Sequence, residues 1–394
     1  MAGSVILAGA RTPIGKLSGA LASFSAMDLG GIAIAAALQR AGIPPEKVDY
    51  VFVGQVLQAG QGQITARQAA TNAGIPMTVP ATTVNKVCLS GLNAIHLADL
   101  MIRSGEAEVV VAGGMESMTR APYLLPDARS GYRLGDGKLV DSMMFDGLTC
   151  AFDHCAMGLS TDRDTGKAGI ARERQDAFSA LSHERAAAAQ KEGRFAGEIT
   201  PVEVPQRKGE PVTVDGDEGV RPGTTSEALA KLKPAFDPAG SVTAGNASQI
   251  SDGAAAVIVA RRDVAEKLGA RPLGTVVSYG QVAGPDASLL HQPSTATKQA
   301  LAKAGQSIGD VDLFEINEAF ASVTLASMDD LGITGEICNV NGGAVALGHP
   351  IGASGTRLVL TLLHELQRRG GGLGSASLCG GGGQGDAILV SSEV

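Results

Sequence analysis

Apolar and polar residues alternate along the chain in blocks that predict strands and helices in turn. Residues 4–8 form a short apolar run with no basic residue before it, which predicts a first strand rather than a signal peptide. A helix is predicted to begin near Ser25, with Asp28 as its capping partner, and to end at Gly42. The apolar run at 48–54 predicts the next strand, so the start of the chain indicates a layered α/β architecture.

A second predicted helix begins after Cys88 and is apolar on most sides, which indicates a buried helix. Its apolar positions are Leu92, Ile95, Leu97, Leu100 and Met101. A strand is predicted directly after it, at 108–112. Near the end of the chain an apolar helix over 358–366 and a strand over 374–378 give the same order of elements.

The first part of the chain is repeated near its end. Residues 37–42 and 48–54 match residues 300–305 and 311–317, both pairs at an offset of 263. We therefore predict one fold written twice. The expected division is an N-terminal half at 1–120 and 250–271, an inserted loop domain at 121–249 and a C-terminal half at 272–394. Within the insertion, a charged amphipathic helix over 173–194 is expected to be a solvated outer face and nothing more.

Composition excludes several classes of protein. Glycine supplies 53 of 394 residues, about twice the usual share of roughly 7%, without the period of collagen. A net charge of -8 argues against a nucleic-acid partner, and no apolar run is long enough to span a membrane. The five cysteines form no CxxC pair, which is typical of reduced thiols, so we expect a cytoplasmic protein.

Three residues at predicted element boundaries carry candidate chemistry. Cys88 precedes a helix, whose dipole and free amides stabilise a thiolate. His349 lies between Gly348 and Pro350 in a glycine-rich loop, where an imidazole can take a proton from a thiol and return it. Cys379 precedes four glycines, a backbone able to bring amide donors close to an acyl oxygen. Taken singly, these patterns are also typical of a small core residue, a surface loop and a tight turn; together they supply the parts for covalent acyl transfer coupled to proton abstraction.

In five segments the chain resembles the thiolase family, above all its acetyl-transferring members. The segments are Val-Cys-Leu-Ser-Gly at 87–91, Asn-Glu-Ala-Phe at 317–320, Asn-Gly-Gly-Ala at 341–344, Gly-His-Pro-Ile-Gly-Ala-Ser-Gly at 348–355 and Cys-Gly-Gly-Gly at 379–382. The likeness covers nearly the whole chain. It implies the duplicated, five-layered α-β-α-β-α fold of that family with an inserted loop domain. It also implies condensation of two acetyl-CoA molecules to acetoacetyl-CoA and CoA, or the reverse thiolysis.

The resemblance also implies a role for each reactive residue. Cys88 is expected to be acylated by a first acyl-CoA with His349 as its base, and Cys379 to remove an α proton from a second. Asn317, through a water, and His349 are expected to hold one oxyanion, and the amides of Cys88 and Gly381 the other. The kinetics are then ping-pong, CoA thioesters are substrates, and no cofactor is expected.

Contacts to coenzyme A are expected from the same resemblance. Arg221 is expected to meet the nucleotide end and Ser248 the pantetheine. The residues expected to line the acyl and pantetheine tunnel are Leu148, Met157, Ala319 and Phe320. The alternatives are that Arg221 is an ordinary surface charge and that Leu148 or Phe320 is a core residue.

One departure leaves the acyl length open. Many short-chain members carry a histidine before the Met-Gly of this loop, whereas this chain has Ala156 before Met157. A broader-chain 3-ketoacyl-CoA thiolase is therefore an alternative function. A ketoacyl synthase is a second alternative, but those enzymes pair their cysteine with histidines or with histidine and asparagine, where this chain offers Cys379. A noncatalytic acyl-CoA-binding protein on this fold is a third alternative, but it is expected to lack the thiols.

Two further expectations concern metals and assembly. The spacing of Cys150, His154 and Cys155 fits no common structural zinc site and lacks a fourth ligand, so no metal is expected. A homotetramer built as a dimer of dimers is expected from the resemblance and from the segment 123–146. That segment carries the exposed-looking residues Leu124, Leu125, Met143 and Met144.

Overall fold

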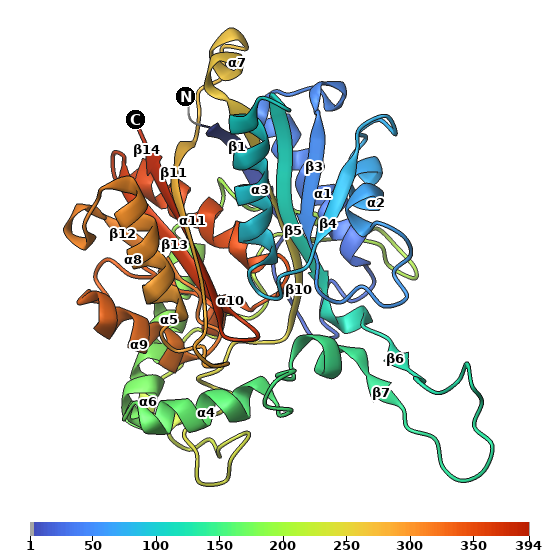
Figure 1. Cartoon of the computed structure of the whole chain (residues 1–394), viewed down its shortest axis with the longest axis vertical. Coiled ribbons are helices and arrows are strands. Elements are labelled where there is room, and N and C mark those ends of the chain that lie inside the picture. Colours follow the sequence, from blue (N-terminus) through green and yellow to red (C-terminus); the bar gives the residue numbers. More distant parts are fainter. Residues whose placement is uncertain (1–3, 394) are drawn as a thin grey trace.

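The computed structural model describes residues 4–393 and is built around one long mixed sheet (Figure 1). The strands follow the order β4-β3-β5-β10-β1-β11-β14-β13-β12, and β2 pairs with β10. Their bounds are β1 (Ser4–Arg11), β2 (Gly15–Lys16), β3 (Tyr50–Gly54), β4 (Ala81–Val84), β5 (Val109–Ser117), β10 (Ser251–Arg261), β11 (Gly274–Ala283), β12 (Leu313–Ile316), β13 (Gly372–Gly380) and β14 (Gln384–Ser392).

This long sheet is two copies of one smaller sheet. Among residues 4–393, strand pairing joins the two copies where β1 meets β11, through the pairs Val5 with Thr275 and Ile6 with Gly274. The first copy has the order β4-β3-β5-β10-β1, so the third strand along the chain lies at the edge, followed by the second, fourth, fifth and first. The second copy has the same order, with β12, β13, β14 and β11 in the last four positions and a parallel bridge between Cys338 and Phe314 at the edge. The parallel and antiparallel pairings also agree. The predicted duplication is therefore present in the topology.

Helices cover the outer faces of the two copies of the sheet and also lie between their inner faces, which gives five layers (Figure 1). The pair α1 (Ala26–Ala41) and α2 (Thr65–Asn72) covers the outer side of the first sheet, and α8 (Gln292–Ala304) covers the second, with α9 (Ala321–Leu331) beside it. Between the sheets lie α3 (Ser90–Ser104) and α11 (Ser354–Arg368), in contact with each other and with strands of both copies. Leu92 and Ile95 of α3 and the apolar run of α11 are buried because they face the sheets. The expectation for the rest of α3 is wrong, since Leu97 and Met101 are only partly buried and Leu100 is exposed.

Local sequence decides where the first helix begins and ends. The hydroxyl of Ser25 accepts a hydrogen bond from the Asp28 backbone amide, and the Asp28 carboxylate accepts one from the Ser25 amide. The helix ends at Gly42, which adopts the left-handed conformation with φ 64°. Both features agree with the sequence-based expectation.

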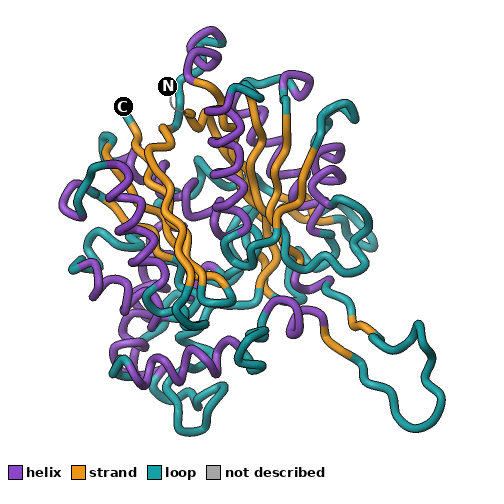
Figure 2. Tube along the Cα trace, in the orientation of Figure 1, coloured by secondary structure: helices purple, strands orange, loops and turns teal. Residues whose placement is uncertain are grey.

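The segment between β5 and β10 forms smaller elements beside the duplicated core. Helices there are α4 (Met157–Lys167), α5 (Arg172–Lys191) and α6 (Ser226–Leu229), and the short hairpins are β6 (Tyr123–Leu124) with β7 (Val140–Asp141) and β8 (Val202–Val204) with β9 (Val212–Val214). The β6–β7 hairpin and its loop extend away from the body as an arm (Figures 1 and 2). Outside the segment lie α7 (Arg262–Lys267) and α10 (Ala344–Leu347).

The expectation for the charged helix of the insertion is wrong. One face of α5 is buried, including Ser182, His183, Ala186 and Ala189, and it packs against α9 and α10. Small and polar residues can be buried there because their polar atoms find partners, which a hydropathy pattern does not reveal. Across residues 4–393 we find no helix long and apolar enough to cross a membrane.

Candidate active site

A strained turn between β4 and α3 presents Cys88. Val87 adopts φ 50°, a conformation that β-branched residues rarely take. The hydroxyl of Ser90 stabilises the turn, since it accepts from the Lys86 amide at 2.8 Å and donates to the Val87 carbonyl at 2.6 Å. The helix then begins at Ser90. Cys88 is thereby held at the N-terminus of a buried helix, as predicted.

The N-termini of α3 and α11 meet next to this turn. A Cβ on Gly91 would lie 2.8 Å from the Gly352 carbonyl oxygen, so only glycine permits this approach. The Thr356 hydroxyl donates to the Gly91 carbonyl at 3.0 Å and joins the two helices. Both helix dipoles therefore direct their positive ends toward the same place, which favours a developing negative charge there.

His349 lies buried in the loop before α11, in one defined tautomer. The Ser354 hydroxyl donates to the Pro350 carbonyl, so its 2.6 Å contact with His349 Nδ1 makes that nitrogen the donor. Nε2 then carries the lone pair and accepts from Asn317 Nδ2 at 3.4 Å. Burial and the nearby Arg357 charge lower the pKa of His349 to about 3, so the imidazole is neutral and can accept a proton.

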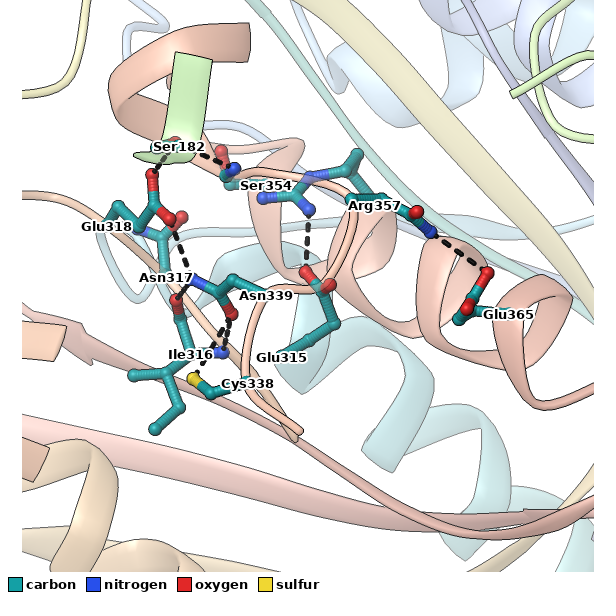
Figure 3. A network of polar contacts seen from close by, with 12 residues as sticks. Ser182, Glu315, Ile316, Asn317, Glu318, Cys338, Asn339, Ser354, Arg357 and Glu365 are labelled. Carbon is teal, nitrogen blue, oxygen red and sulfur yellow. Dashed lines mark hydrogen bonds and ion pairs between the residues drawn. The ribbon is translucent and has the colours of Figure 1, made fainter. Parts of the chain in front are cut away.

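The buried carboxylate of Glu318, the residue after Asn317, contacts Ser182 and Asn339 (Figure 3). Glu318 accepts from Asn339 Nδ2 at 2.9 Å, from the Ser182 hydroxyl at 2.7 Å and from the Val345 amide at 3.0 Å. Val345 lies in α10, directly before the His349 loop, and Ser182 comes from α5. The insertion therefore contributes a positioning contact to the site.

Cys379 and Gly381 lie at the turn between β13 and β14. Cys379 is buried at the end of β13, where burial, and the charge of Cys88 whenever that thiol is ionised, raise its pKa well above the ordinary value. Burial also raises the pKa of Cys88 to about 12, although the backbone amides of Cys88 and Gly381 face the thiol and lower it. Desolvation therefore outweighs the stabilisation of the thiolate that the amides at the helix N-terminus provide.

The predicted site residues gather around a small chamber of about 70 Å³. Its lining includes Cys88, Leu148, Met157, Ser248, Ala319, Phe320, His349, Cys379 and Gly381. Asn317 does not line the chamber, but its side chain contacts His349, which does. Every residue that the sequence assigned to catalysis or to the acyl tunnel is thus at this chamber or in contact with it, except Arg221.

Arg221 lies on a second cavity of about 470 Å³ that shares a wall with the chamber. Leu148, Met157, Ser248 and His349 line both spaces, so the larger cavity forms a mostly apolar tunnel that leads to the reactive groups. Ala156, the position of the missing histidine, lines this tunnel and is not on the wall of the chamber.

Sequence reasoning missed Glu116, which links the two halves at the site. Its carboxylate accepts from the backbone amides of Val56, Leu57 and Gly352, and burial raises its pKa to about 7. The indications in the sequence are an acidic residue in a mostly apolar strand and its place in the segment 113–118, which resembles the thiolase family. Among residues 4–393 we find no group of three histidine, cysteine or acidic side chains placed to hold a metal ion.

Family models match nearly the whole chain. The thiolase N-terminal domain matches residues 4–263, and the thiolase C-terminal domain matches residues 270–392. The chain belongs to the thiolase family. This confirms the family and the duplicated fold predicted from the sequence.

Relatives in this family agree along their full length. The chain is 55% identical to a probable acetyl-CoA acetyltransferase of Mycobacterium leprae and 53% identical to an acetyl-CoA acetyltransferase of Pseudomonas aeruginosa, in both cases over 99% of each chain. The crystal structure of the Bacillus anthracis acetyl-CoA acetyltransferase superimposes with a TM-score of 0.97 at 40% identity and covers 100% of this chain and 99% of that one.

Proposed function

We propose that this protein transfers an acetyl group between two acetyl-CoA molecules through Cys88, forming acetoacetyl-CoA and CoA, and that it catalyses the reverse thiolysis. The observation that carries the proposal is the convergence of two thiols, one neutral imidazole and the Gly381 amide on one chamber at the end of an apolar tunnel. The names of the mycobacterial and pseudomonad relatives support the same reaction.

In the first half reaction Cys88 is acetylated. His349 Nε2 accepts the thiol proton while sulfur attacks the thioester carbonyl, the bond to the CoA sulfur breaks, and His349 returns the proton to that sulfur. With the pKa of Cys88 at about 12 and that of His349 at about 3, proton transfer accompanies attack rather than preceding it. The amides of Cys88 and Gly381 donate to the oxyanion of the tetrahedral intermediate.

In the second half reaction Cys379, as a thiolate, takes a proton from the methyl group of a second acetyl-CoA. The carbanion attacks the acetyl carbonyl, the new C–C bond forms, the bond to Cys88 breaks, and Cys379 returns its proton to the Cys88 sulfur. Burial raises the pKa of Cys379 well above its ordinary value, so the thiolate is a minor form at neutral pH and is the form that takes the α proton.

Asn317 and the tunnel residues complete the proposal. Asn317 Oδ1 is buried and accepts no hydrogen bond from the described residues, 4–393, so it supplies an acceptor for the water that is proposed to hold the enolate oxygen. His349 can join this water as a second donor only when Nε2 carries a proton. Arg221 and Ser248 are proposed to contact the nucleotide and pantetheine parts of CoA, because both line the tunnel.

Acetylation of the enzyme by acetyl-CoA alone tests this function. Intact mass is expected to show one acetyl adduct per chain, and peptide mapping is expected to place it on Cys88, since the first half reaction needs no second substrate. A Cys88→Ser variant serves as the matched control and is expected to remain unmodified under the same conditions. An adduct on Cys379, Cys150 or Cys155 refutes the assignment of the nucleophile.

We also propose a homotetramer built as a pair of dimers. The arm between β6 and β7 presents apolar side chains to solvent, including Tyr123, Leu125 and Leu134, although Leu124 and Met143 are partly buried rather than exposed. Light scattering is expected to give a tetramer for the full chain and a dimer when residues 125–139 are replaced by an Asn-Gly turn. A monomer mass at micromolar concentration refutes the proposal.

The five cysteines are free thiols, which supports a reducing compartment such as the cytoplasm.

A further inference from the structure

An ion pair connects the nucleophile turn to the other half of the molecule. Lys86, two residues before Cys88, places Nζ 2.8 and 2.9 Å from the two carboxylate oxygens of Asp386. The Asp386 side chain is wholly buried, whereas that of Lys86 is 20% exposed. Tyr279 donates its hydroxyl to Asp386 Oδ2 at 2.6 Å, so the carboxylate is held from two directions.

The position of Asp386 in the sheet makes this pair relevant to the chemistry. Asp386 lies on β14 directly opposite Leu378, the residue before Cys379. The turn that contains Gly381 joins β13 to β14 at the same end of the hairpin. The ion pair therefore ties the turn of the first thiol to the hairpin that carries the second thiol and the Gly381 amide.

This connection is needed because the oxyanion hole is divided between the halves. One of its amides comes from Cys88 in the first half and the other from Gly381 in the second. The strands that lead to them, β4 and β13, are not neighbours in the sheet, so no ladder of backbone hydrogen bonds sets their separation. The strained φ of Val87 must also be maintained by contacts around the turn.

Building on the proposed function, we propose that Lys86 and Asp386 are positioning residues that hold the amides of Cys88 and Gly381 at the separation one acyl oxyanion requires. Neither residue lines the chamber, so their effect passes through the backbone of the turn and the hairpin. Loss of the pair misplaces one donor relative to the other. Such a displacement acts on the transition state of acylation and leaves binding of CoA in the tunnel largely unchanged.

The test compares Lys86→Met with Lys86→Arg and with a matched control, Lys303→Met. Lys303 is a suitable control because its Nζ donates to the Tyr279 carbonyl at 2.9 Å, beside the same cluster, without contacting the nucleophile turn. Rapid-quench measurement gives the rate of acetyl-Cys88 formation and the acetyl-CoA concentration at half-saturation. Alkylation by iodoacetamide reports on the thiol itself, because that reaction forms no oxyanion.

Lys86→Met is expected to acetylate about 10- to 100-fold more slowly, with half-saturation and alkylation within about threefold of the wild type. Lys86→Arg is expected to recover most of the rate, and Lys303→Met to match the wild type. Should Lys86→Met fail to fold, Asp386→Asn, which keeps a polar side chain beside Tyr279, is expected to show the same selective loss of acetylation.

Two outcomes overturn the positioning role alone. One is acetylation of the folded Lys86→Met or Asp386→Asn variant at the wild-type rate. The other is an equal fall in acetylation and alkylation together with a lower unfolding temperature, which indicates a merely structural ion pair. A wild-type enzyme that forms no acetyl-Cys88 refutes the proposed function, and the positioning role falls with it.

Discussion

Replacing Cys379 by alanine separates the two half reactions. Acetylation of Cys88 is expected to survive, because the variant retains the nucleophile, His349 and the Gly381 amide. Condensation is expected to fall by about 10²- to 10⁴-fold, the usual contribution of a general base. The loss should approach the upper limit, because the only other ionisable side chains on the chamber wall are Cys88, which is acylated at this stage, and His349. With a pKa of about 3, His349 is a poor base for a carbon acid.

The structural cost of the same change is small. Cys379 is 1% exposed, and removing one sulfur atom from a packed site is expected to lower the free energy of unfolding by about 1 kcal/mol. Cys379→Ser is the matched control, since it fills nearly the same volume but provides a far weaker base at neutral pH. Both variants are expected to accumulate acetyl-enzyme and to stall in condensation.

Rapid-quench measurement of acetyl-enzyme formation beside steady-state condensation provides the assay. Equal losses in the two half reactions refute the reasoning, because they show that Cys379 supports the structure of the site or the activation of Cys88. Condensation within tenfold of the wild type in both variants also refutes it, since another group then removes the α proton.

Three further predictions follow from the packing, the pKa values and the tunnel. Arg357→Met leaves the buried Glu315, which Arg357 NH1 contacts at 2.9 Å, without its partner; because burial raises the pKa of Glu315 to about 8, urea unfolding is expected to show the full loss of about 3–5 kcal/mol only well above that pH, Glu315→Gln is expected largely to restore it there, and no restoration contradicts the pairing argument. Alkylation of Cys88 is expected to rise about tenfold per pH unit from pH 7 to 10, because its pKa of about 12 leaves little thiolate below that range. With a pKa of about 3, His349 should add no inflection near pH 6.5. A plateau below pH 9 contradicts the pKa of Cys88, and an inflection near pH 6.5 contradicts that of His349. Because Ala156 lines the tunnel and is smaller than a histidine, thiolysis of six-carbon ketoacyl-CoA is expected to proceed with appreciable kcat/KM, and a drop of several orders of magnitude from the four-carbon substrate shows that the missing histidine is compensated elsewhere.

Some features of the site could be predicted because the interactions behind them are local. Ser25, Asp28 and Gly42 define a helix through contacts within a few residues, and the structure reproduces them. The internal repeat predicted two copies of one sheet, and both have the same strand order. Taken singly, the motifs around Cys88 and Cys379 did not distinguish a reactive thiol from a core residue or a tight turn. Only their combination indicated a shared site.

Other features depend on groups that are distant in the sequence. The charged pattern of α5 indicated a solvated face, but Ser182 donates to Glu318, 136 residues away, and His183 Nδ1 accepts from the Arg221 amide. Such partners decide whether a polar side chain can be buried, and no local pattern encodes them. Glu116 was missed for the same reason, since the amide of Gly352 lies 236 residues away from it.

The sequence by itself determined the elements, the duplication and the chemical groups available for acyl transfer, because hydrogen bonding along a helix, glycine turns and residue identity are local properties. The tertiary structure alone decided the protonation of those groups. A helix N-terminus favours the thiolate of Cys88, yet walls contributed by both halves and the insertion remove water from the thiol and raise its pKa to about 12. Desolvation depends on everything that surrounds a group in space, so it is defined only once the chain has folded.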